Sequence, residues 1–571
     1  MSEATIRWVG GPVLYARMQG EFRVGEALQV GAARRPGEVI RLKGDELVGQ
    51  VYEDTTGLKP GDTIQGTGAA LSVRLGPHLL GRIFDGLLRP LETQAEGEFA
   101  FRPLVKVGAT LSPGAAIGEL PGDGIKQRVL CPPRIGGTVE SVAAAGRYSA
   151  DATLCTIKDA NGDTRDIGFF HSWPIRQARP VRQRLPADAP MITGQRILDT
   201  LFPVARGGQA AIPGGFGTGK TVLQETLAKW CDADVIVYVG CGERGNEMAE
   251  VLREFPKLSD PRTGRGLMER TLIIANTSNM PVAAREASIY TAVTVGEYFR
   301  DQGLHVALMA DSTSRWAEAL REVSGRLGEL PGEAAYPAYL GSRLAEFYER
   351  AAKVTTLSGE AGSLTIIGAV SPPAGDFSEP VTSHTKRYVR CFWGLDRERA
   401  QARFYPAIHP LQSYSENALR FAAWWTERGN PDWHTHREKL LSLLEAQADL
   451  ERMARIVGKD ALPPAQQLTL LCAELVNEAF LRQSAFSEVD RYCSPQRQTA
   501  MLGLILHFIE LAETALAHAI APQKIAELPV LRRLQRMGEE IGEDQPNKFS
   551  ELRASLDAAM GDLEKAAPHA A

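Results

Sequence analysis

The chain has 571 residues, about twice what a single hydrophobic core usually serves, so we expect several domains. Hydrophobic residues make up 44% and charged residues 23%, which argues against a disordered, collagen-like or membrane-embedded chain. The net charge of −5 provides no basic excess for a phosphate backbone, so we expect no nucleic acid as a partner.

The first part of the chain is typical of β structure. Between Thr5 and Val73, short strand-like segments are separated by turns rich in Gly, Pro and Asp, which is the pattern of a small antiparallel barrel. From about Glu92 to Pro180, strand-like segments are again interrupted by Gly and Pro. We therefore predict an N-terminal β barrel over residues 1–75 and an inserted β-rich domain over residues 92–180.

From about Ile192 the pattern changes to that of an α/β protein. Four apolar runs alternate with helical segments, and they begin at Val235, Thr271, His305 and Ser363. Such runs are typical of parallel strands that are buried on both faces of a sheet. After about Pro410 helical periodicity takes over. The prediction is a multidomain α/β chain with a central parallel-sheet domain over 190–410 and a C-terminal helical bundle over 411–571.

Three features bear on location. The first residues, MSEATIRWVGG, lack a basic segment followed by an apolar core, so we expect no secretory signal peptide. The most apolar helical segment, from Ala500 to Ala517, carries His507, Glu510 and Glu513, which are too costly for a lipid-facing span. The seven cysteines form no CxxC pair, and we interpret them as reduced and mostly packed. We therefore expect a cytosolic chain that reaches a membrane only through partners.

Residues 214–221 fit the phosphate-binding loop pattern GxxxxGK[ST]. The loop consists of Gly214, Gly215, Phe216, Gly217, Thr218, Gly219, Lys220 and Thr221. Its glycines let backbone N–H groups curl around the phosphates of ATP or ADP, and the following helix directs its positive end at the same charge. Lys220 is expected to reach the β and γ phosphates, and the Thr221 hydroxyl to hold Mg²⁺. The alternative is an incidental glycine loop, which the apolar AAIP segment before it and the amphipathic helix after it disfavour.

Two further segments place charged side chains where a strand ends. HVALMAD ends in Asp311, which in a phosphate-loop domain would complete the Mg²⁺ site through water. VGCGERGNE places Glu243 and Arg244 at the carboxyl end of a strand, where open α/β folds bind ligands. Glu243 is the candidate to orient the attacking water, and Arg244 to meet phosphate charge. Taken alone, Asp311 could equally be a structural aspartate. For Glu243 and Arg244 taken alone, surface ion pairs would be the favoured interpretation.

The chain resembles the catalytic A subunits of rotary V/A-type ATPases. The segments that carry the resemblance are IPGGFGTGKT, VGCGERGNEMAEVL, ADSTSRWAEALRE, PAYLGSRLAEFYERA, VSPPAGDFSEPVT and QSAFSEVDRYC, in the family's order. The resemblance covers essentially the whole chain and implies a phosphate-loop (RecA-like) nucleotide-binding domain. It also implies that the segment over 92–180 is the extra, non-homologous domain of the catalytic chains.

The resemblance also implies roles for single residues. Lys220 and Thr221 match the phosphate and Mg²⁺ residues, Glu243 matches the catalytic glutamate, Arg244 matches an arginine near the γ phosphate, and Asp311 matches the strand-end aspartate. Phe404 in ARFYPAI and Phe486 in QSAF match aromatic residues that line the adenine pocket, with core packing as the alternative. Gly215 replaces the family's usual Pro or Ala, so we expect a looser loop. Thr218 replaces a cysteine of eukaryotic relatives, so thiol-based inactivation should not transfer.

The implied assembly is a hexamer of three A and three B subunits with central and peripheral stalks. Each catalytic site would lie at an A/B interface and receive an arginine from the B subunit. The assembly would be the soluble head on the cytoplasmic side of a membrane sector that the chain meets only indirectly. The implied activity is ATP synthesis from ADP and phosphate, or ATP hydrolysis, coupled to the transport of protons, with Na⁺ as the alternative ion.

Three other interpretations remain. The first two are a flagellar or secretion ATPase and an F-type subunit, which the inserted β-rich domain and the GERGNE segment disfavour. The third is a nucleotide-binding assembly protein without turnover. The set of Lys220, Thr221, Glu243 and Asp311 disfavours it, because a protein that only binds nucleotide has no need for a water-orienting acid.

Overall fold

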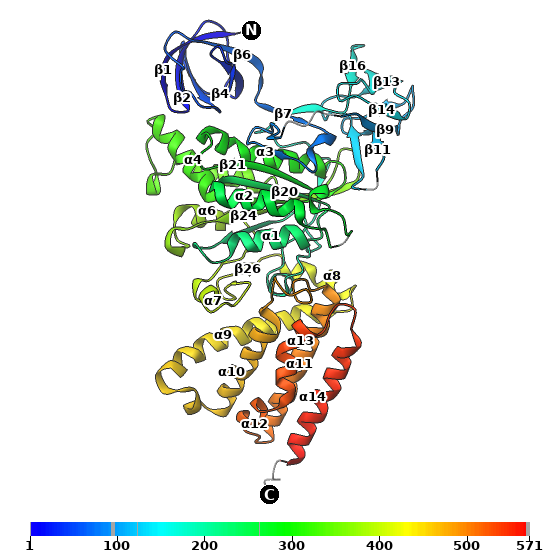
Figure 1. The fold of residues 1–571 in the computed structure, drawn as a ribbon, viewed down its shortest axis with the longest axis vertical. Coiled ribbons are helices and arrows are strands. Elements are labelled where there is room, and N and C mark those ends of the chain that lie inside the picture. Colours follow the sequence, from blue (N-terminus) through cyan, green and yellow to red (C-terminus); the bar gives the residue numbers. More distant parts are fainter. Residues whose placement is uncertain (1, 93–96, 123, 262, 567–571) are drawn as a thin grey trace. The chain divides into compact units, whose positions relative to one another are not determined.

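The computed structural model describes residues 2–92, 97–122, 124–261 and 263–566. The chain forms two compact units (Figure 1). Unit 1 comprises Met1–Pro186, Arg206–Ala211 and Ala233–Val389, and unit 2 comprises Ala187–Ala205, Ile212–Asp232 and Arg390–Ala571. The phosphate-loop segment, residues 214–221, belongs to unit 2.

The N-terminal segment of unit 1 is a closed barrel of six antiparallel strands, as its pattern predicted. The strand order is β1-β2-β5-β4-β3-β6, and β1 pairs with β6 to close the barrel. Ile6, Leu14, Val30, Val39 and Leu47 point inward and are at most 1% exposed. The strands are β1 (Glu3–Gly10), β2 (Val13–Met18), β3 (Glu26–Val30), β4 (Arg35–Lys43), β5 (Glu46–Val51) and β6 (Thr63–Ala70).

The second β-rich segment contains two four-stranded antiparallel sheets, ordered β10-β13-β15-β16 and β12-β11-β9-β14. They share a core that includes Phe101, Ile117, Val139 and Ile157. The strands are β9 (Phe99–Pro103), β10 (Thr110–Leu111), β11 (Ala116–Leu120), β12 (Gln127–Leu130), β13 (Gly137–Val142), β14 (Gly146–Tyr148), β15 (Cys155–Lys158) and β16 (Thr164–Ile167). On either side of this segment in the chain, β7 (Ser72–Leu75) and β17 (His171–Pro174) pair with each other.

Unit 1 also contains the parallel sheet that the apolar runs predicted. Its strands lie in the order β19-β24-β22-β20-β21-β8, and the pairs from β24 to β8 are parallel. The strands are β8 (Ile83–Phe84), β19 (Gln209–Pro213), β20 (Val235–Glu243), β21 (Thr271–Thr277), β22 (His305–Asp311) and β24 (Ala361–Val370). Two short strands extend the sheet beyond β24, β23 (Ala352–Thr355) and β18 (Gln183–Arg184).

Helix α3 (Val282–Arg300) is the central helix of this unit. It contacts β20, β22 and β21, and every residue from Ala283 to Arg300 is buried. This burial on all faces explains why the apolar residues of the helix are not confined to one stripe. The other helices of unit 1 are α2 (Gly245–Glu254), α4 (Thr313–Arg326), α5 (Leu340–Tyr348) and α6 (Pro380–Tyr388).

Unit 2 is largely helical, as predicted for the C-terminal part of the chain. It also holds a short antiparallel pair, β25 (Cys391–Phe392) and β26 (Tyr414–Ser415). Trp425 and Trp433 stack with their ring centroids 5.5 Å apart and are fully buried. The helices are α1 (Lys220–Trp230), α7 (Arg397–Gln401), α8 (Ala422–Thr426), α9 (Trp433–Val457), α10 (Pro464–Val476), α11 (Pro495–Ala517), α12 (Pro522–Ala526), α13 (Pro529–Glu540) and α14 (Asn547–Ala566).

Helix α11 is, among the described residues, the one helix long and apolar enough to cross a membrane by length and composition. Half of its apolar window is buried within the protein, where α11 packs against α10, α13 and α14. Glu510 and Glu513 are exposed. We therefore interpret α11 as the core helix of the bundle. All seven cysteines are buried, as expected for packed residues.

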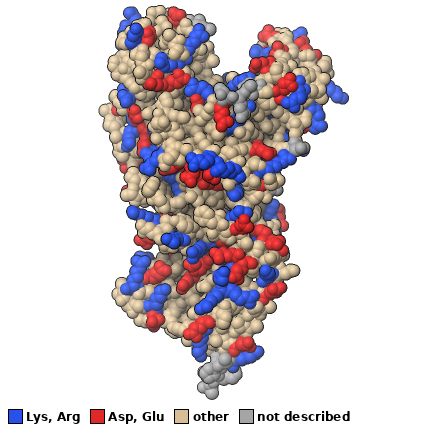
Figure 2. Space-filling model, viewed as in Figure 1, with Lys and Arg blue, Asp and Glu red and all other residues tan. Residues whose placement is uncertain are grey.

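On the face shown in Figure 2, Lys and Arg side chains are interspersed with Asp and Glu side chains. This mixture of signs agrees with the small net charge of −5.

Candidate functional site

The phosphate loop joins β19, which ends at Pro213, to α1, which begins at Lys220. Gly219 caps the helix with φ of +83°, a conformation that side chains with a Cβ rarely adopt. Thr218 is buried, and its hydroxyl donates to the carbonyl oxygen of Gly215 over 2.8 Å. This bond joins two residues of the loop, and one of them is Gly215.

The first turn of α1 carries the side chains expected at the phosphates. Lys220 and Thr221 are both half-buried there, and Phe216 in the loop is 89% exposed. The amino end of a helix bears a partial positive charge and N–H groups that the helix itself does not use. The loop and this turn together therefore form a site for an anion such as a phosphate.

A cavity of about 860 Å³ adjoins the phosphate loop, within unit 2. One wall consists of Gly217–Gly219 and the start of α1, and a second of Tyr405–Ala407. A third wall is the segment Arg482–Phe486, and a fourth comes from α13 near Gly538. Its volume is in the range of small-molecule sites in proteins.

Tyr405, not Phe404, is the aromatic residue on the cavity wall beside the loop. Tyr405 is 42% exposed, and its ring lies 3.5 Å from where a Cβ on Gly219 would be. Phe404 does not line the cavity, and its ring packs against the guanidinium of Arg399, 4.6 Å from the ring centroid. The placement expected for Phe404 is thus corrected by one residue, because neighbouring side chains in this turn point in different directions. Phe486, which is 93% exposed, also lines the cavity.

The two carboxylates expected in catalysis lie at one edge of the parallel sheet in unit 1. Asp311 is paired in register with Gly240, three residues before Glu243 at the end of β20. Asp311 is 2% exposed, and the Tyr238 hydroxyl donates to its Oδ2 over 3.3 Å. Glu243 is half-buried, and Arg244, which precedes α2, is exposed.

Two arginines that the sequence did not single out flank the turn that carries Glu243. Side-chain atoms of Arg285 on α3 and of Arg315 on α4 lie 2.7 and 2.9 Å from where a Cβ on Gly242 would be. The pKa of Arg315 is raised, first by its hydrogen bond to Glu318 and then by charges that include that of Glu243. Both arginines lie inside predicted helices, and no local pattern distinguishes them from surface charges.

The donor groups fit Mg²⁺. The Thr221 hydroxyl and the Asp311 carboxylate are oxygen ligands of the kind that Mg²⁺ prefers, and Mg²⁺ usually keeps several of its waters. The described part of the chain contains no group of three or more His, Cys, Asp and Glu side chains that could hold a metal ion.

The fold and the loop define the class as phosphate-loop nucleotide-binding proteins with a β barrel before and helices after the binding domain. Family models of the ATP synthase alpha/beta family match in this order: the beta-barrel domain over 7–68, the barrel-sandwich domain over 90–176 and the nucleotide-binding domain over 194–415. The C-terminal domain of V and A type ATP synthase matches over 422–525.

Curated relatives narrow this class to one type of polypeptide. The chain is 49% identical to the A subunit of the A-type ATP synthase of Methanopyrus kandleri, over 97% of each chain. It is 50% identical to the corresponding polypeptide of Thermococcus onnurineus, over 93% of this chain and 94% of the relative. It is also 49% identical to the V-type ATP synthase alpha chain of Halothermothrix orenii, over 97% of each. The chain therefore belongs to the family of A subunits of A-type and V-type ATP synthases.

A solved structure shows that the fold is shared more widely. The type III secretion ATPase EscN of enteropathogenic E. coli aligns with a TM-score of 0.65 at 23% identity, over 88% of this chain and 100% of that one. At this identity the likeness concerns the fold alone.

Proposed function

We propose that this chain supplies the nucleotide site of a rotary ATP synthase or ATPase, with the phosphate loop and the cavity beside it as that site. The observation that carries the proposal is that the loop and two aromatic side chains, Tyr405 and Phe486, line one cavity. Loop N–H groups and Lys220 would bind the phosphates of ATP or ADP. The aromatic walls would hold the flat adenine base.

The chemistry requires positioning and charge stabilisation. Lys220 and Arg244 would neutralise phosphate charge, while Glu243 would orient the attacking water and accept its proton. Thr221 and Asp311 would hold Mg²⁺, which when bound neutralises charge on phosphate oxygens. Arg285 and Arg315 would act as positioning residues, because they support the turn that carries Glu243.

The proposal extends to the assembly. Family membership supports a multi-subunit complex, and we propose that a B-type subunit completes each site in a hexamer of three A and three B subunits. Central and peripheral stalks would connect this head to a membrane sector on its cytoplasmic side. Protons are the proposed transported ion. The full-length relatives at 49–50% identity belong to A-type and V-type synthases, and they support this assembly over an F-type or secretion ATPase.

The test is Mg²⁺-dependent ATP hydrolysis by the chain reconstituted with its B-type subunit. Glu243→Gln should lower kcat by about 10²- to 10⁴-fold and still bind nucleotide, because only the water-orienting acid is lost. Lys220→Ala should lose nucleotide binding itself. Glu250→Gln, at an exposed position of α2, is the matched control and should behave as wild type.

Two results would contradict the proposal. Normal turnover in Glu243→Gln would remove this residue from the mechanism and direct the search to another acid. A wild-type complex that binds ADP but does not hydrolyse ATP would favour the nucleotide-binding assembly protein.

A further inference from the structure

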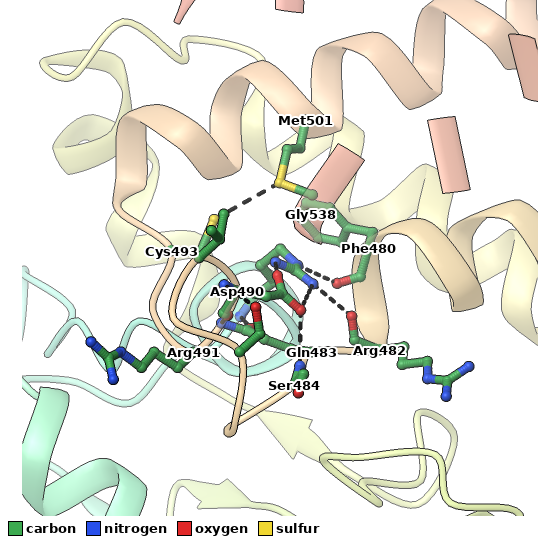
Figure 3. A network of polar contacts seen from close by, with 12 residues as sticks. Phe480, Arg482, Gln483, Ser484, Asp490, Arg491, Cys493, Met501 and Gly538 are labelled. Atoms are coloured by element: carbon green, nitrogen blue, oxygen red, sulfur yellow. Dashed lines mark hydrogen bonds and ion pairs between the residues drawn. The ribbon is translucent and has the colours of Figure 1, made fainter. Parts of the chain in front are cut away.

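A buried ion pair lies beside the cavity in unit 2. Arg196 is 1% and Asp490 3% exposed, and Arg196 Nη1 lies 2.5 Å from Asp490 Oδ1. The guanidinium also donates to two backbone carbonyl oxygens. Its Nε donates to that of Phe480 over 2.7 Å, and its Nη2 donates to that of Arg482 over 2.6 Å. Figure 3 shows Phe480, Arg482 and Asp490 gathered in this network of polar contacts. Burying such a pair seldom adds stability, so its use here points to a role in geometry.

The pair holds the segment that carries Phe486. The second carboxylate oxygen of Asp490 accepts the Ser484 N–H over 2.8 Å, which closes the loop between Ser484 and Asp490. The Gln483 side chain accepts the backbone N–H of Arg196 over 2.8 Å and donates to the Asp490 carbonyl over 2.9 Å. Phe486 therefore projects from a loop whose two ends are both fixed to the ion pair.

The same network holds the other aromatic wall. The backbone N–H of Gln483 donates to the carbonyl oxygen of Tyr405 over 2.8 Å. Its side chain also donates to the Gly194 carbonyl over 2.8 Å. The relative positions of Tyr405 and Phe486 thus depend on Gln483 and, through it, on Arg196.

Helix α13 of the bundle packs directly on this ion pair. A Cβ on Gly538 would lie 2.9 Å from Asp490 Oδ1 and 3.3 Å from both Nη atoms of Arg196. Arg497 fixes the helix by donating to the Gly538 carbonyl over 2.5 Å and to the Val489 carbonyl over 2.9 Å. Close contact between helix and ion pair is possible only because residue 538 has no side chain.

We propose that Arg196, Gln483, Asp490 and Gly538, the Arg196 network, are positioning residues that couple the base-binding walls of the cavity to helix α13. The contact between α13 and the ion pair sets the affinity for the nucleotide base, while the phosphate loop binds phosphate independently of it. By linkage, a bound base holds α13 on the pair to the same extent. The inference rests on the proposed nucleotide site and adds a link between that site and the C-terminal bundle.

The test is Gly538→Ala in the full-length chain within its assembled complex. A methyl group at this position must shift the ion pair or the helix. Equilibrium binding of Mg-ADP should weaken by about five- to tenfold, in the range of typical couplings between sites. Binding of Mg-tripolyphosphate, which has no base, should stay unchanged. Gly561→Ala on α14, where a Cβ meets nothing within 4 Å, is the matched control and should change neither.

A second variant covers the case in which Gly538→Ala fails to assemble. Asp490→Asn removes the negative charge that pairs with Arg196. The control is Asp301→Asn, which removes the negative charge from the buried pair with Arg179 in unit 1. Only Asp490→Asn should change the ratio of ADP affinity to tripolyphosphate affinity.

An unchanged ratio in both Gly538→Ala and Asp490→Asn would overturn the inference, as would equal weakening of the two ligands. Failure of the wild-type complex to bind ADP would instead overturn the proposed nucleotide site.

Discussion

Tyr405 is the residue from which the clearest test of the cavity follows. Replacing it with Ala should weaken ADP binding by about 1–3 kcal/mol, because the stacking surface for the base is lost. Tyr405→Phe keeps that surface and should retain the affinity. Phe404→Ala should leave it unchanged, since the Phe404 ring packs on Arg399 outside the cavity. Competition with a fluorescent nucleotide measures the ADP affinity of all three variants. A larger loss of affinity in Phe404→Ala than in Tyr405→Ala would contradict the placement of Tyr405 on the cavity wall.

His78 is a residue whose burial makes stability depend on pH. It is 8% exposed and packs edge-on against Phe84 and Phe170. Burial, together with the charges of Arg74 and Arg82, lowers the pKa of His78 to about 4 from 6.5. Protonation therefore favours the unfolded chain.

The stabilisation that neutral His78 provides should be complete above pH 6.5. It should be lost as the pH falls toward 4, by up to about 3 kcal/mol. The variant His78→Gln cannot take up this proton. The melting temperature of the wild type should therefore fall relative to that of the variant as the pH decreases. Melting curves from pH 7 to pH 4 measure this difference in melting temperature. A difference that does not change with pH would show that His78 does not titrate in this range.

Among the secondary-structure elements, α11 shows how a long apolar helix can form the core of a helical bundle. Ile505 and Phe508 are fully buried. Ile505→Ala should lower the free energy of unfolding by about 2–5 kcal/mol, because it leaves a cavity in the bundle. Glu510→Gln on the exposed face should change it by less than about 0.5 kcal/mol. Denaturant titration, followed by the helicity of unit 2, measures the free energy of unfolding of both variants. Equal losses in the two variants would contradict a core position for α11.

Across the molecule, Arg176 joins three separate segments of unit 1. Its guanidinium pairs with Glu38 of the barrel over 2.9 Å and with Glu286 of α3 over 2.8 Å. Tyr52 donates to Glu38 over 2.5 Å in the same cluster. The nearly buried carboxylates of Glu38 and Glu286 therefore share Arg176 as a counter-charge. In the sequence, Arg176 lies between the barrel and the sheet domain.

Removing that cation should destabilise unit 1 as a whole. Arg176→Ala leaves Glu38 and Glu286 buried without their counter-charge and should cost about 3–5 kcal/mol. Arg17→Ala breaks the exposed pair with Asp45 and should cost at most about 1 kcal/mol. Calorimetric melting separates them, with the larger downward shift expected for Arg176→Ala. Shifts of the same size would mean that the buried cluster adds nothing to the attachment of the barrel.

Local patterns in the sequence were sufficient for much of this protein. Strands β20, β21, β22 and β24 appear as apolar runs because both of their faces are buried, and barrel strand β3 alternates because one of its faces is buried. The phosphate loop is contiguous, so its eight residues identify it without knowledge of the fold. Glu243 and Asp311 could likewise be placed at one sheet edge, because parallel strands end on the same side.

Tertiary structure alone decided the features that depend on packing between distant segments. The choice of Tyr405 over Phe404 depends on a turn whose side-chain directions no periodic pattern encodes. The contact of Gly538 with Arg196 joins positions far apart in the chain, and a helical glycine has no local signal for it. The assignment of the phosphate loop to the unit of the C-terminal helices has the same cause. Periodicity reports which face of an element is buried, whereas the partner that buries it is chosen by long-range packing.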